Sequence, residues 1–319
     1  IMVTILCFFS ACNKKVVEEK KEVGYKIHPR DKWYCAAIDK EGNIWVGGDG
    51  GRIIFSKDSG KTWDMQQSNT PNTIYGISIV GNGESAMGVA VGRFGTIIKT
   101  TDGGRIWAIK NAGTQSTLYD VCFVNSQSGW AVGEMGTVLH TEDGGETWVS
   151  QVSGEDLHLN GVFFLDMLHG WIAAEYGAIF RTEDGGKTWE KIQVSEFTVY
   201  SIYFIDLAEG WVVGENGQIF HTTDGGKTWM PQQSNIGTHL FSVIFKGNNG
   251  WAVGLKGTLI KTTDGGRSWE REDLPIPHFV WLSKIVASPE GGGKKVIVGN
   301  AGVVLRQDES GKWLFSAEG

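Results

Sequence analysis

Two groups of side chains in this sequence could carry out chemistry. The four cysteines and seven histidines could bind a metal ion, but no cysteine–histidine pair has the spacing of a metal site. Arginines could bind the carboxylate of an acidic sugar, beside a tyrosine nucleophile and carboxylates for acid–base catalysis. The arginines are few and dispersed: Arg30, Arg52, Arg93, Arg105, Arg181, Arg267, Arg271 and Arg306. We therefore expect no metal site, no cofactor and no catalytic centre.

A sequence repeat determines the strands and turns that position these side chains. A tryptophan returns seven times, at intervals of 44, 41, 41, 40, 40 and 44 residues, five positions after an aspartate. The aspartate can accept backbone N–H groups in a turn, the glycines between them tolerate positive φ, and the tryptophan can pack across the hairpin. The pairs are Asp58 and Trp63, Asp102 and Trp107, Asp143 and Trp148, Asp184 and Trp189, Asp224 and Trp229, Asp264 and Trp269, and Asp308 and Trp313.

A second element precedes each of these boxes. In the third copy, Gly129-Trp130-Ala-Val-Gly133 leads through a short tip to Gly136-Thr-Val-Leu-His140, and an apolar run comes before it. With the strand after each tryptophan, every repeat has four short strands, and seven such units must stack to bury both faces of each sheet. The sequence predicts an all-β protein, a seven-bladed β-propeller over residues 31–319, with four antiparallel strands and one Asp-box hairpin per blade.

The repeated Gly-Trp-x-x-Gly and Thr-x-Asp-Gly-Gly-x-Thr-Trp patterns resemble the Asp-box, or bacterial neuraminidase repeat, propellers. One box per blade and seven blades resemble the photosystem II assembly and stability factor family most closely. This resemblance implies a non-enzymatic, membrane-associated scaffold that binds a protein client. Sialidases also carry Asp boxes, so a sialidase-like glycoside hydrolase is the alternative. Two arginines lie at box tips, one at an opposite tip, and none converge, which favours the scaffold.

The first residues form a separate segment. An apolar run ends in Phe9-Ser-Ala-Cys12, which resembles a bacterial lipobox and implies a signal peptide over residues 1–12 that is cleaved before Cys12, with Cys12 diacylated. An ordinary secretory signal is the alternative. Residues 13–30 are rich in lysine and glutamate and are interpreted as a solvated tether. The resemblance predicts a bacterial membrane-attached lipoprotein facing the periplasm or the exterior.

The hairpin tips opposite the boxes form a candidate partner-binding face. Four of the seven first tip residues are acidic, whereas five of six equivalent box positions are basic, so we expect an electrically two-sided disc. The second tip residues include Phe94, Met135 and Tyr176. The first tip residues are Asp49, Arg93, Glu134, Glu175, Glu215, Leu255 and Asn300, and the box residues are Lys61, Arg105, Glu146, Lys187, Lys227 and Arg267.

The positions that open the seven apolar runs are mostly aromatic. In a propeller the first strand lines the central channel, so six aromatic rings could surround the channel mouth on the acidic face. Packing between blades explains the same pattern, and both interpretations stay open. The residues are Tyr34, Tyr75, Tyr119, Asn160, Tyr200, Phe241 and Trp281.

The net charge and the cysteines lead to further expectations about the partners and the disulfide bonds. A net charge of −7 argues against nucleic acid, which needs a basic surface. Cys35 and Cys122 fall in non-adjacent blades and are expected to be free, buried thiols. We predict a monomer that binds a membrane protein or protein complex. A glycan-binding module is a further alternative, because aromatic rings with acidic neighbours also suit sugars.

Overall fold

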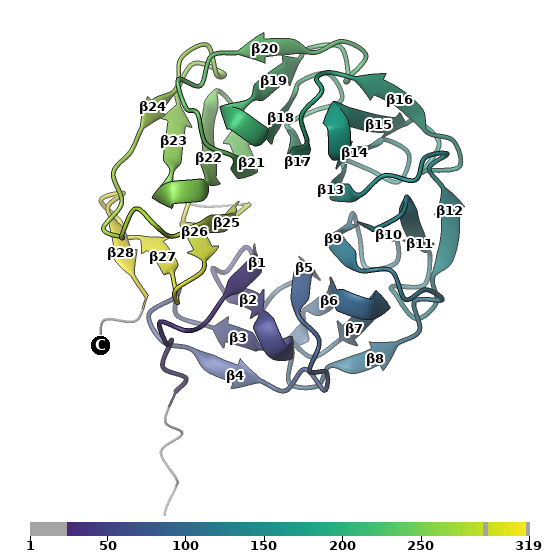
Figure 1. Ribbon diagram of the computed structural model, residues 1–319. Coiled ribbons are helices and arrows are strands. Elements are labelled where there is room, and N and C mark those ends of the chain that lie inside the picture. The colour runs from purple at the N-terminus through teal and green to yellow at the C-terminus, as the bar shows by residue number, and fades with distance from the viewer. Residues whose placement is uncertain (1–23, 290–292, 317–319) are drawn as a thin grey trace, which may run out of the picture.

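The computed structural model describes residues 24–289 and 293–316. Seven four-stranded antiparallel sheets stand around a central axis, and each takes its strands from one continuous stretch of chain (Figure 1). In every sheet the first strand is innermost and the fourth lies at the rim (Figure 1). The predicted seven-bladed propeller is therefore confirmed, with the blade as the repeating unit.

The strands follow the repeat seen in the sequence. Blades one to four contain β1 (Trp33–Ile38), β2 (Ile44–Gly48), β3 (Ile53–Ser56) and β4 (Asp64–Gln66); β5 (Ile74–Val80), β6 (Met87–Gly92), β7 (Thr96–Thr100) and β8 (Ala108–Lys110); β9 (Leu118–Phe123), β10 (Gly129–Gly133), β11 (Thr137–Thr141) and β12 (Val149–Val152); and β13 (Leu159–Phe164), β14 (Gly170–Ala174), β15 (Ala178–Thr182) and β16 (Glu190–Gln193).

The remaining blades have the same order. Blades five to seven contain β17 (Val199–Phe204), β18 (Gly210–Gly214), β19 (Ile219–Thr222) and β20 (Met230–Gln232); β21 (Leu240–Lys246), β22 (Asn249–Gly254), β23 (Leu259–Thr262) and β24 (Glu270–Arg271); and β25 (Leu282–Ala287), β26 (Lys295–Gly299), β27 (Val304–Gln307) and β28 (Trp313–Phe315). Single 3-10 turns occur at Asp49–Gly51, Gly83–Ser85, Arg93–Gly95, Glu175–Gly177, Glu215–Gly217 and Leu255–Gly257.

The tryptophans of the second strands join neighbouring blades. Trp130 on β10 stacks on Phe164 of the next blade, with ring centroids 3.6 Å apart, and its indole N–H donates to the Gly185 carbonyl at 3.1 Å. Gly170 makes room for this ring, because a Cβ there would lie 2.4 Å from Phe164. Trp189, the box tryptophan of blade four, meets the same ring edge-on. The Gly-Trp pattern thus encodes a contact between blades. The stack recurs in Trp171 on Phe204 and Trp211 on Phe245.

Three of the box tryptophans, Trp107, Trp269 and Trp313, also hydrogen-bond to the preceding blade, which the hairpin interpretation did not predict. Trp107 donates its indole N–H to the side-chain oxygen of Gln66, at the end of blade one, at 3.0 Å. The Gln66 amide nitrogen donates to the Gly103 carbonyl at 2.8 Å. A Cβ at Gly104 would come within 2.1 Å of the Gln66 side-chain oxygen. The second glycine of this box is therefore required by the neighbouring blade as well as by the turn.

Replacing Gln66 with leucine is expected to lower the free energy of unfolding by about 1–3 kcal/mol, because a partner of the Trp107 indole and the Gly103 carbonyl is lost. Urea unfolding monitored by tryptophan fluorescence measures the change. Met65→Leu, at an exposed neighbouring position of β4, is the control and should stay within about 0.5 kcal/mol of wild type. Equal stabilities of the two variants would contradict this role of Gln66.

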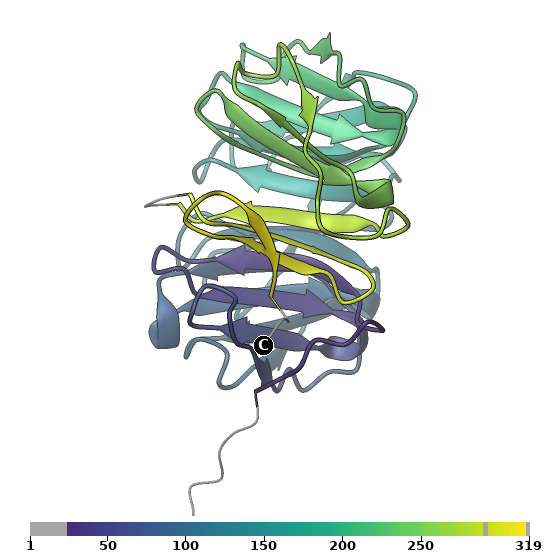
Figure 2. The ribbon, with the colours of Figure 1, turned by 90° about the vertical axis from the view of Figure 1, so that its left-hand side faces the viewer.

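Within the described residues, the ring closes without exchange of strands between the chain ends. Blade seven is formed by β25 to β28 alone, as predicted. Tyr25 lies outside any strand, but its backbone N–H donates to the Trp63 carbonyl at 2.5 Å, and the Gly302 N–H of blade seven donates to the Asp31 carbonyl at 2.9 Å. Residues 25–31 therefore lie across the seam between blades one and seven, and both ends of the described chain lie at the rim there (Figure 2).

Candidate partner-binding face

The aromatic residues at the start of the first strands contact one another around the tip end of the channel. Tyr34 and Tyr75 have ring centroids 5.1 Å apart, Tyr75 and Tyr119 lie 6.0 Å apart, and Tyr119 lies 6.0 Å from His158. A second group joins Tyr200 to Phe241 at 5.2 Å. All these rings are half-buried. They form two arcs across neighbouring first strands. In each arc the rings pack against rings of the next blade and are also partly exposed.

One predicted member of the aromatic set, Trp281, does not occupy the shared position. Leu282 pairs with Gly299 and Lys284 pairs with Val298, so Ser283 lies at the bulge that Tyr34 occupies in blade one, between Trp33 and Cys35. Trp281 comes one residue before β25. The Ser283 hydroxyl instead donates to the Trp33 carbonyl of blade one at 2.7 Å. Every first strand has this bulge, so the equivalent residue of blade seven is the non-aromatic Ser283, and the prediction chose Trp281, two residues earlier, because it is aromatic.

The acidic tip residues are hydrogen-bonded to the residues that begin the first strands. Glu134 accepts the Thr117 backbone N–H at 2.8 Å and the Tyr119 hydroxyl at 3.2 Å. Glu215 accepts the Tyr200 hydroxyl at 3.1 Å, and Glu175 accepts the His158 backbone N–H at 3.0 Å. The Thr117 N–H lowers the pKa of Glu134, while burial raises the pKa of Tyr119. Glu134 is therefore ionised and orients the neutral Tyr119 side chain.

The second residue of each tip has left-handed backbone geometry. Phe94 has φ 57°, Met135 has φ 53° and Tyr176 has φ 54°, although glycine or asparagine adopts this region at less cost. Their side chains are 54%, 72% and 64% exposed. Arg93 lies over the Phe94 ring, 4.6 Å from its centroid. Three consecutive blades thus present large apolar side chains to solvent from unfavourable backbone positions, which is typical of a functional surface.

The channel beneath the tips contains a cavity of about 290 Å³ lined by the first strands. In each first strand, the residue directly after the bulge lies at the channel. This residue is small in five blades, but it is Asp120 in blade three and Lys284 in blade seven. Their side chains approach to 3.8 Å across the axis. The second Asp120 oxygen also accepts the Val162 backbone N–H of blade four at 3.2 Å. This ion pair links opposite sides of the ring, and sequence reasoning missed it because the partners are far apart in the chain.

The two cysteines of the propeller are free thiols, as predicted, although only Cys35 is a fully buried residue and Cys122 is partly exposed. Burial raises the pKa of Cys35 to about 12 and that of Cys122 to about 11. Both thiols are therefore protonated and poorly reactive near neutral pH. Among residues 24–289 and 293–316, no group of three histidine, cysteine, aspartate or glutamate side chains could hold a metal ion.

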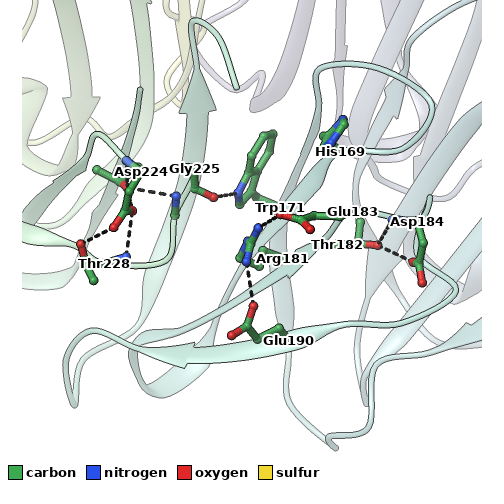
Figure 3. Close-up of polar contacts among 12 residues, drawn as sticks. His169, Trp171, Arg181, Thr182, Glu183, Asp184, Glu190, Asp224, Gly225 and Thr228 are labelled. Atoms are coloured by element: carbon green, nitrogen blue, oxygen red, sulfur yellow. Dashed lines mark hydrogen bonds and ion pairs between the residues drawn. The ribbon is translucent and has the colours of Figure 1, made fainter. Parts of the chain in front are cut away.

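The Asp boxes are hydrogen-bonded turns on the opposite face (Figure 3). One Asp224 oxygen accepts the Thr228 backbone N–H at 2.9 Å and the Thr222 hydroxyl at 2.8 Å, and the other accepts the Thr228 hydroxyl at 2.6 Å. The Thr228 hydroxyl lowers the pKa of Asp224 to about 2. Each basic box residue, such as Lys227, therefore accompanies an ionised aspartate. The box face therefore carries charges of both signs, and the two-sided charge distribution stays a prediction.

These turns predict how stability depends on pH. The pKa values of Asp143 and Asp224 are lowered from 3.8 to about 2 in the folded chain, first by the hydroxyl groups of Thr147 and Thr228. A lowered folded-state pKa stabilises the protein above the unfolded value, so this stabilisation should be lost as the pH falls from about 4 to 2. Denaturation midpoints across that range measure the loss. Asp143→Asn/Asp224→Asn should have a shallower dependence, and an unchanged slope would contradict the assignment.

The arginines do not form a carboxylate-binding cluster in the described part of the chain. Arg181 is buried and pairs with Glu190 at 2.8 Å and with Glu183, at the rim of blade four (Figure 3). Arg52 pairs with Asp31 at 3.5 Å in blade one. Arg105 pairs with Glu84 on the box side of blade two. Each described pair lies on a different blade and already neutralises its arginine.

The predicted signal peptide, Cys12 and residues 13–23 of the tether lie outside the described residues. The described chain begins at Gly24, where a Cβ would lie 3.0 Å from the Trp63 carbonyl at the rim. Within residues 24–289 and 293–316, no helix is both long enough and apolar enough to cross a bilayer.

Comparisons with known proteins agree with this architecture. A structure described as YCF48 bound to D1 peptide has a TM-score of 0.72 at 17% identity, over 89% of this chain and 93% of that one. YCF48 from Cyanidioschyzon merolae has a TM-score of 0.71 at 17% identity, over 88% and 97%. The GH74 xyloglucanase from Xanthomonas campestris has a TM-score of 0.76 at 12% identity, over 92% of this chain but 55% of that one. At these identities the structures show a shared fold.

A search of curated proteins finds no match. The model of a protein family, described as photosynthesis system II assembly factor YCF48, matches residues 65–150, 101–197 and 191–314. These overlapping matches cover β5 through β27 and leave only blade one and the two ends of the chain outside. The chain therefore belongs to the photosynthesis system II assembly factor YCF48 family.

Proposed function

We propose that this protein is a non-enzymatic scaffold that binds an extended segment of a partner protein on its tip face. The observation that carries the proposal is the exposure of Phe94, Met135 and Tyr176 from left-handed positions on three neighbouring blades. Backbone strain and exposed apolar area both cost free energy, and a partner that buries these side chains offsets that cost. Binding of a protein segment thus explains both features at once.

The comparisons support a protein partner. The family is one of assembly factors, and one similar structure holds a D1 peptide. We infer that the client here is likewise a membrane protein or a protein complex. The tip face suits an extended segment because its exposed side chains come from separate hairpins arranged blade by blade rather than from one deep pocket.

A glycan is a less suitable occupant of the aromatic arcs. Sugars stack on open aromatic faces, but Tyr34 meets Tyr75 at an interplanar angle of 65°, and Tyr200 meets Phe241 at 69°. Edge-to-face contacts cover part of each ring with the neighbouring one. A hydrolytic role lacks support for a separate reason: Arg52, Arg105 and Arg181 are paired on three different blades. Binding of a protein segment is therefore the preferred hypothesis over glycan binding and glycoside hydrolysis.

We also propose that Cys12 anchors the protein to a bacterial membrane, as the lipobox-like sequence suggests. The described chain begins at the rim beside Trp63, so an anchor that precedes it leaves the tips accessible. In a bacterial host, Cys12→Ala should move the protein from the membrane fraction to the soluble fraction. Retention in the membrane fraction, together with an unlipidated mass for wild type, would contradict the anchor.

Photo-crosslinking tests the binding face. A benzophenone amino acid placed at Tyr176 should crosslink a partner protein in cells, whereas the same residue placed at Met230, which is similarly exposed on the outer strand of blade five, should not. Mass spectrometry of the crosslinked peptide identifies the partner segment. Crosslinks from Met230 but not from Tyr176 would place the partner elsewhere and overturn the proposal.

A further inference from the structure

We infer that the partner segment is basic with apolar side chains between its charges, and that its basic residues lie over blades three to five. This inference rests on the proposed function and adds the chemistry of the partner and its place on the face. The region, which we call the acidic sector, consists of the tip-side loops at residues 111–117, 134–136, 153–158, 175–177, 194–198, 215–217 and 233–239.

The charge of the acidic sector is one-sided. It has six carboxylates and contains no lysine or arginine. The tip-side segments of the other blades hold the basic residues of this face, namely Lys26, Arg30, Lys32, Arg52, Arg93 and Lys256. The tip face is therefore divided into an acidic half and a mixed half, a division that the net charge of the whole chain conceals. The six carboxylates are Glu134, Glu155, Asp156, Glu175, Glu196 and Glu215.

Backbone hydrogen bonds make the acidic sector one continuous surface. The Gly136 N–H of the blade-three tip donates to the Leu157 carbonyl at 2.7 Å, and the Glu175 N–H donates to the His158 carbonyl at 3.1 Å. The Val194 N–H then donates to the Gly177 carbonyl at 3.0 Å. Each tip is thus fixed against the loop on either side of it, so the carboxylates are held in a defined arrangement across three blades.

Apolar side chains stand among these carboxylates. Met135 and Tyr176 project from the tips, and Phe197 is exposed in the loop after blade four. That loop adjoins the blade-four tip, because the Gln193 amide donates to the Tyr176 carbonyl and a Cβ at Gly177 would lie 2.3 Å from the Ser195 carbonyl. A purely basic segment would leave these apolar groups exposed. The surface therefore fits a segment that combines basic and apolar residues.

Several of the charges are available to such a partner. Asp156 and Glu196 are exposed and form no side-chain hydrogen bond or ion pair with any described residue. Glu155 pairs with Lys191 of β16 at 2.9 Å, and both side chains are more than one-third exposed. These three carboxylates lie outside the hydrogen bonds that orient Tyr119 and Tyr200. They can therefore be neutralised without changing the aromatic arcs.

Synthetic peptides test the charge class. Fluorescence anisotropy would compare a labelled peptide that alternates lysine and arginine with single aromatic residues, the same peptide with glutamate at each basic position, and the basic peptide with glycine at each aromatic position. We expect the basic aromatic peptide to bind most tightly, with an affinity that falls as salt is added. Tighter binding of the acidic peptide would overturn the inference.

The charge-neutralised variant Glu155→Gln/Asp156→Asn/Glu196→Gln should bind the basic aromatic peptide about tenfold more weakly at low salt, because three exposed charge contacts are lost. Glu142→Gln/Glu309→Gln, at exposed box-side positions, is the matched control and should bind like wild type. Circular dichroism checks that both variants remain folded. Equal loss in variant and control would contradict a local effect.

The outcomes separate this inference from the proposed function. If Tyr176 crosslinks a partner segment that is neutral or acidic, the inference is wrong but binding on the tip face still holds. If no residue of the tip face crosslinks a partner, the proposed function itself is contradicted. Binding of the basic peptide that also survives neutralisation of the acidic sector would likewise contradict the inference.

Discussion

Replacing Trp211 with alanine is expected to lower the free energy of unfolding by about 3–5 kcal/mol, the usual range for removal of a large buried aromatic side chain. Trp211 is fully buried, stacks on Phe245 of the next blade at 3.6 Å, and donates its indole N–H to the Gly265 carbonyl at 3.2 Å. The substitution therefore leaves a cavity in the interface and removes one of the two side-chain hydrogen bonds to the Gly265 carbonyl, the other being donated by the Gln232 amide at 3.0 Å. Guanidinium unfolding monitored by circular dichroism measures the loss.

The control for this prediction is Phe279→Ala. Phe279 is also aromatic, but it is 79% exposed on the tip side before β25, so its removal should change stability by no more than about 0.5 kcal/mol. A similar loss in the two variants would show that the stack between blades does not hold the ring together. Retention of wild-type stability by Trp211→Ala would contradict the account of the fold.

Phe94→Asn/Met135→Asn/Tyr176→Asn is expected to weaken binding of the crosslinked partner segment about 100-fold, because three apolar contacts of at least about 1 kcal/mol each are removed. Asparagine is chosen because Asn216 occupies the equivalent tip of blade five with φ 54°. The substituted tips should therefore keep their backbone, and thermal stability should stay equal or rise. Titration calorimetry with the identified segment measures the affinity.

The matched control carries the same substitutions on the opposite face. Met167→Asn/Leu168→Asn/Leu207→Asn replaces apolar side chains of comparable exposure in the box-side loops of blades four and five. This variant should bind the segment as tightly as wild type. Loss of binding in the control with retention in the tip variant would reverse the assignment of the two faces.

The blade architecture could be predicted because its signals lie within one repeat. The spacing of Asp224 and Trp229, and the glycines between them, fit a turn in which the Asp224 carboxylate accepts only local hydrogen bonds. Contacts between blades could not be predicted in the same way. Gln66 and Trp107 are 41 residues apart, and only the ring geometry shows that they meet.

The candidate site was predicted in part. The sequence indicated the tips and five of the six aromatic residues, but the strand pairing places Ser283, not Trp281, at the shared position in β25. The sequence did not show that the acidic tip residues bond to the first strands. Glu134 and Glu215 accept hydrogen bonds from Tyr119 and Tyr200, so they organise the first strands. Such roles depend on side-chain directions that composition and periodicity do not encode.

The charge division across the tip face shows a related limit. Counting first tip residues around the ring predicted an acidic face, but Arg93 belongs to the mixed half of that face. The loops that join one blade to the next supply Glu155, Asp156 and Glu196, which a count of hairpin tips leaves out. Their position beside the tips depends on backbone hydrogen bonds between the tips and these loops, which the sequence does not show.

Hydrogen–deuterium exchange of the protein with its crosslink-identified partner segment tests the central claim most directly. The account predicts slower exchange at residues 134–136, 153–158, 175–177 and 194–198 when the segment is bound, and no change in the Asp boxes that end at Trp189 and Trp229. Protection confined to the boxes, with the tips unchanged, would contradict binding on the tip face.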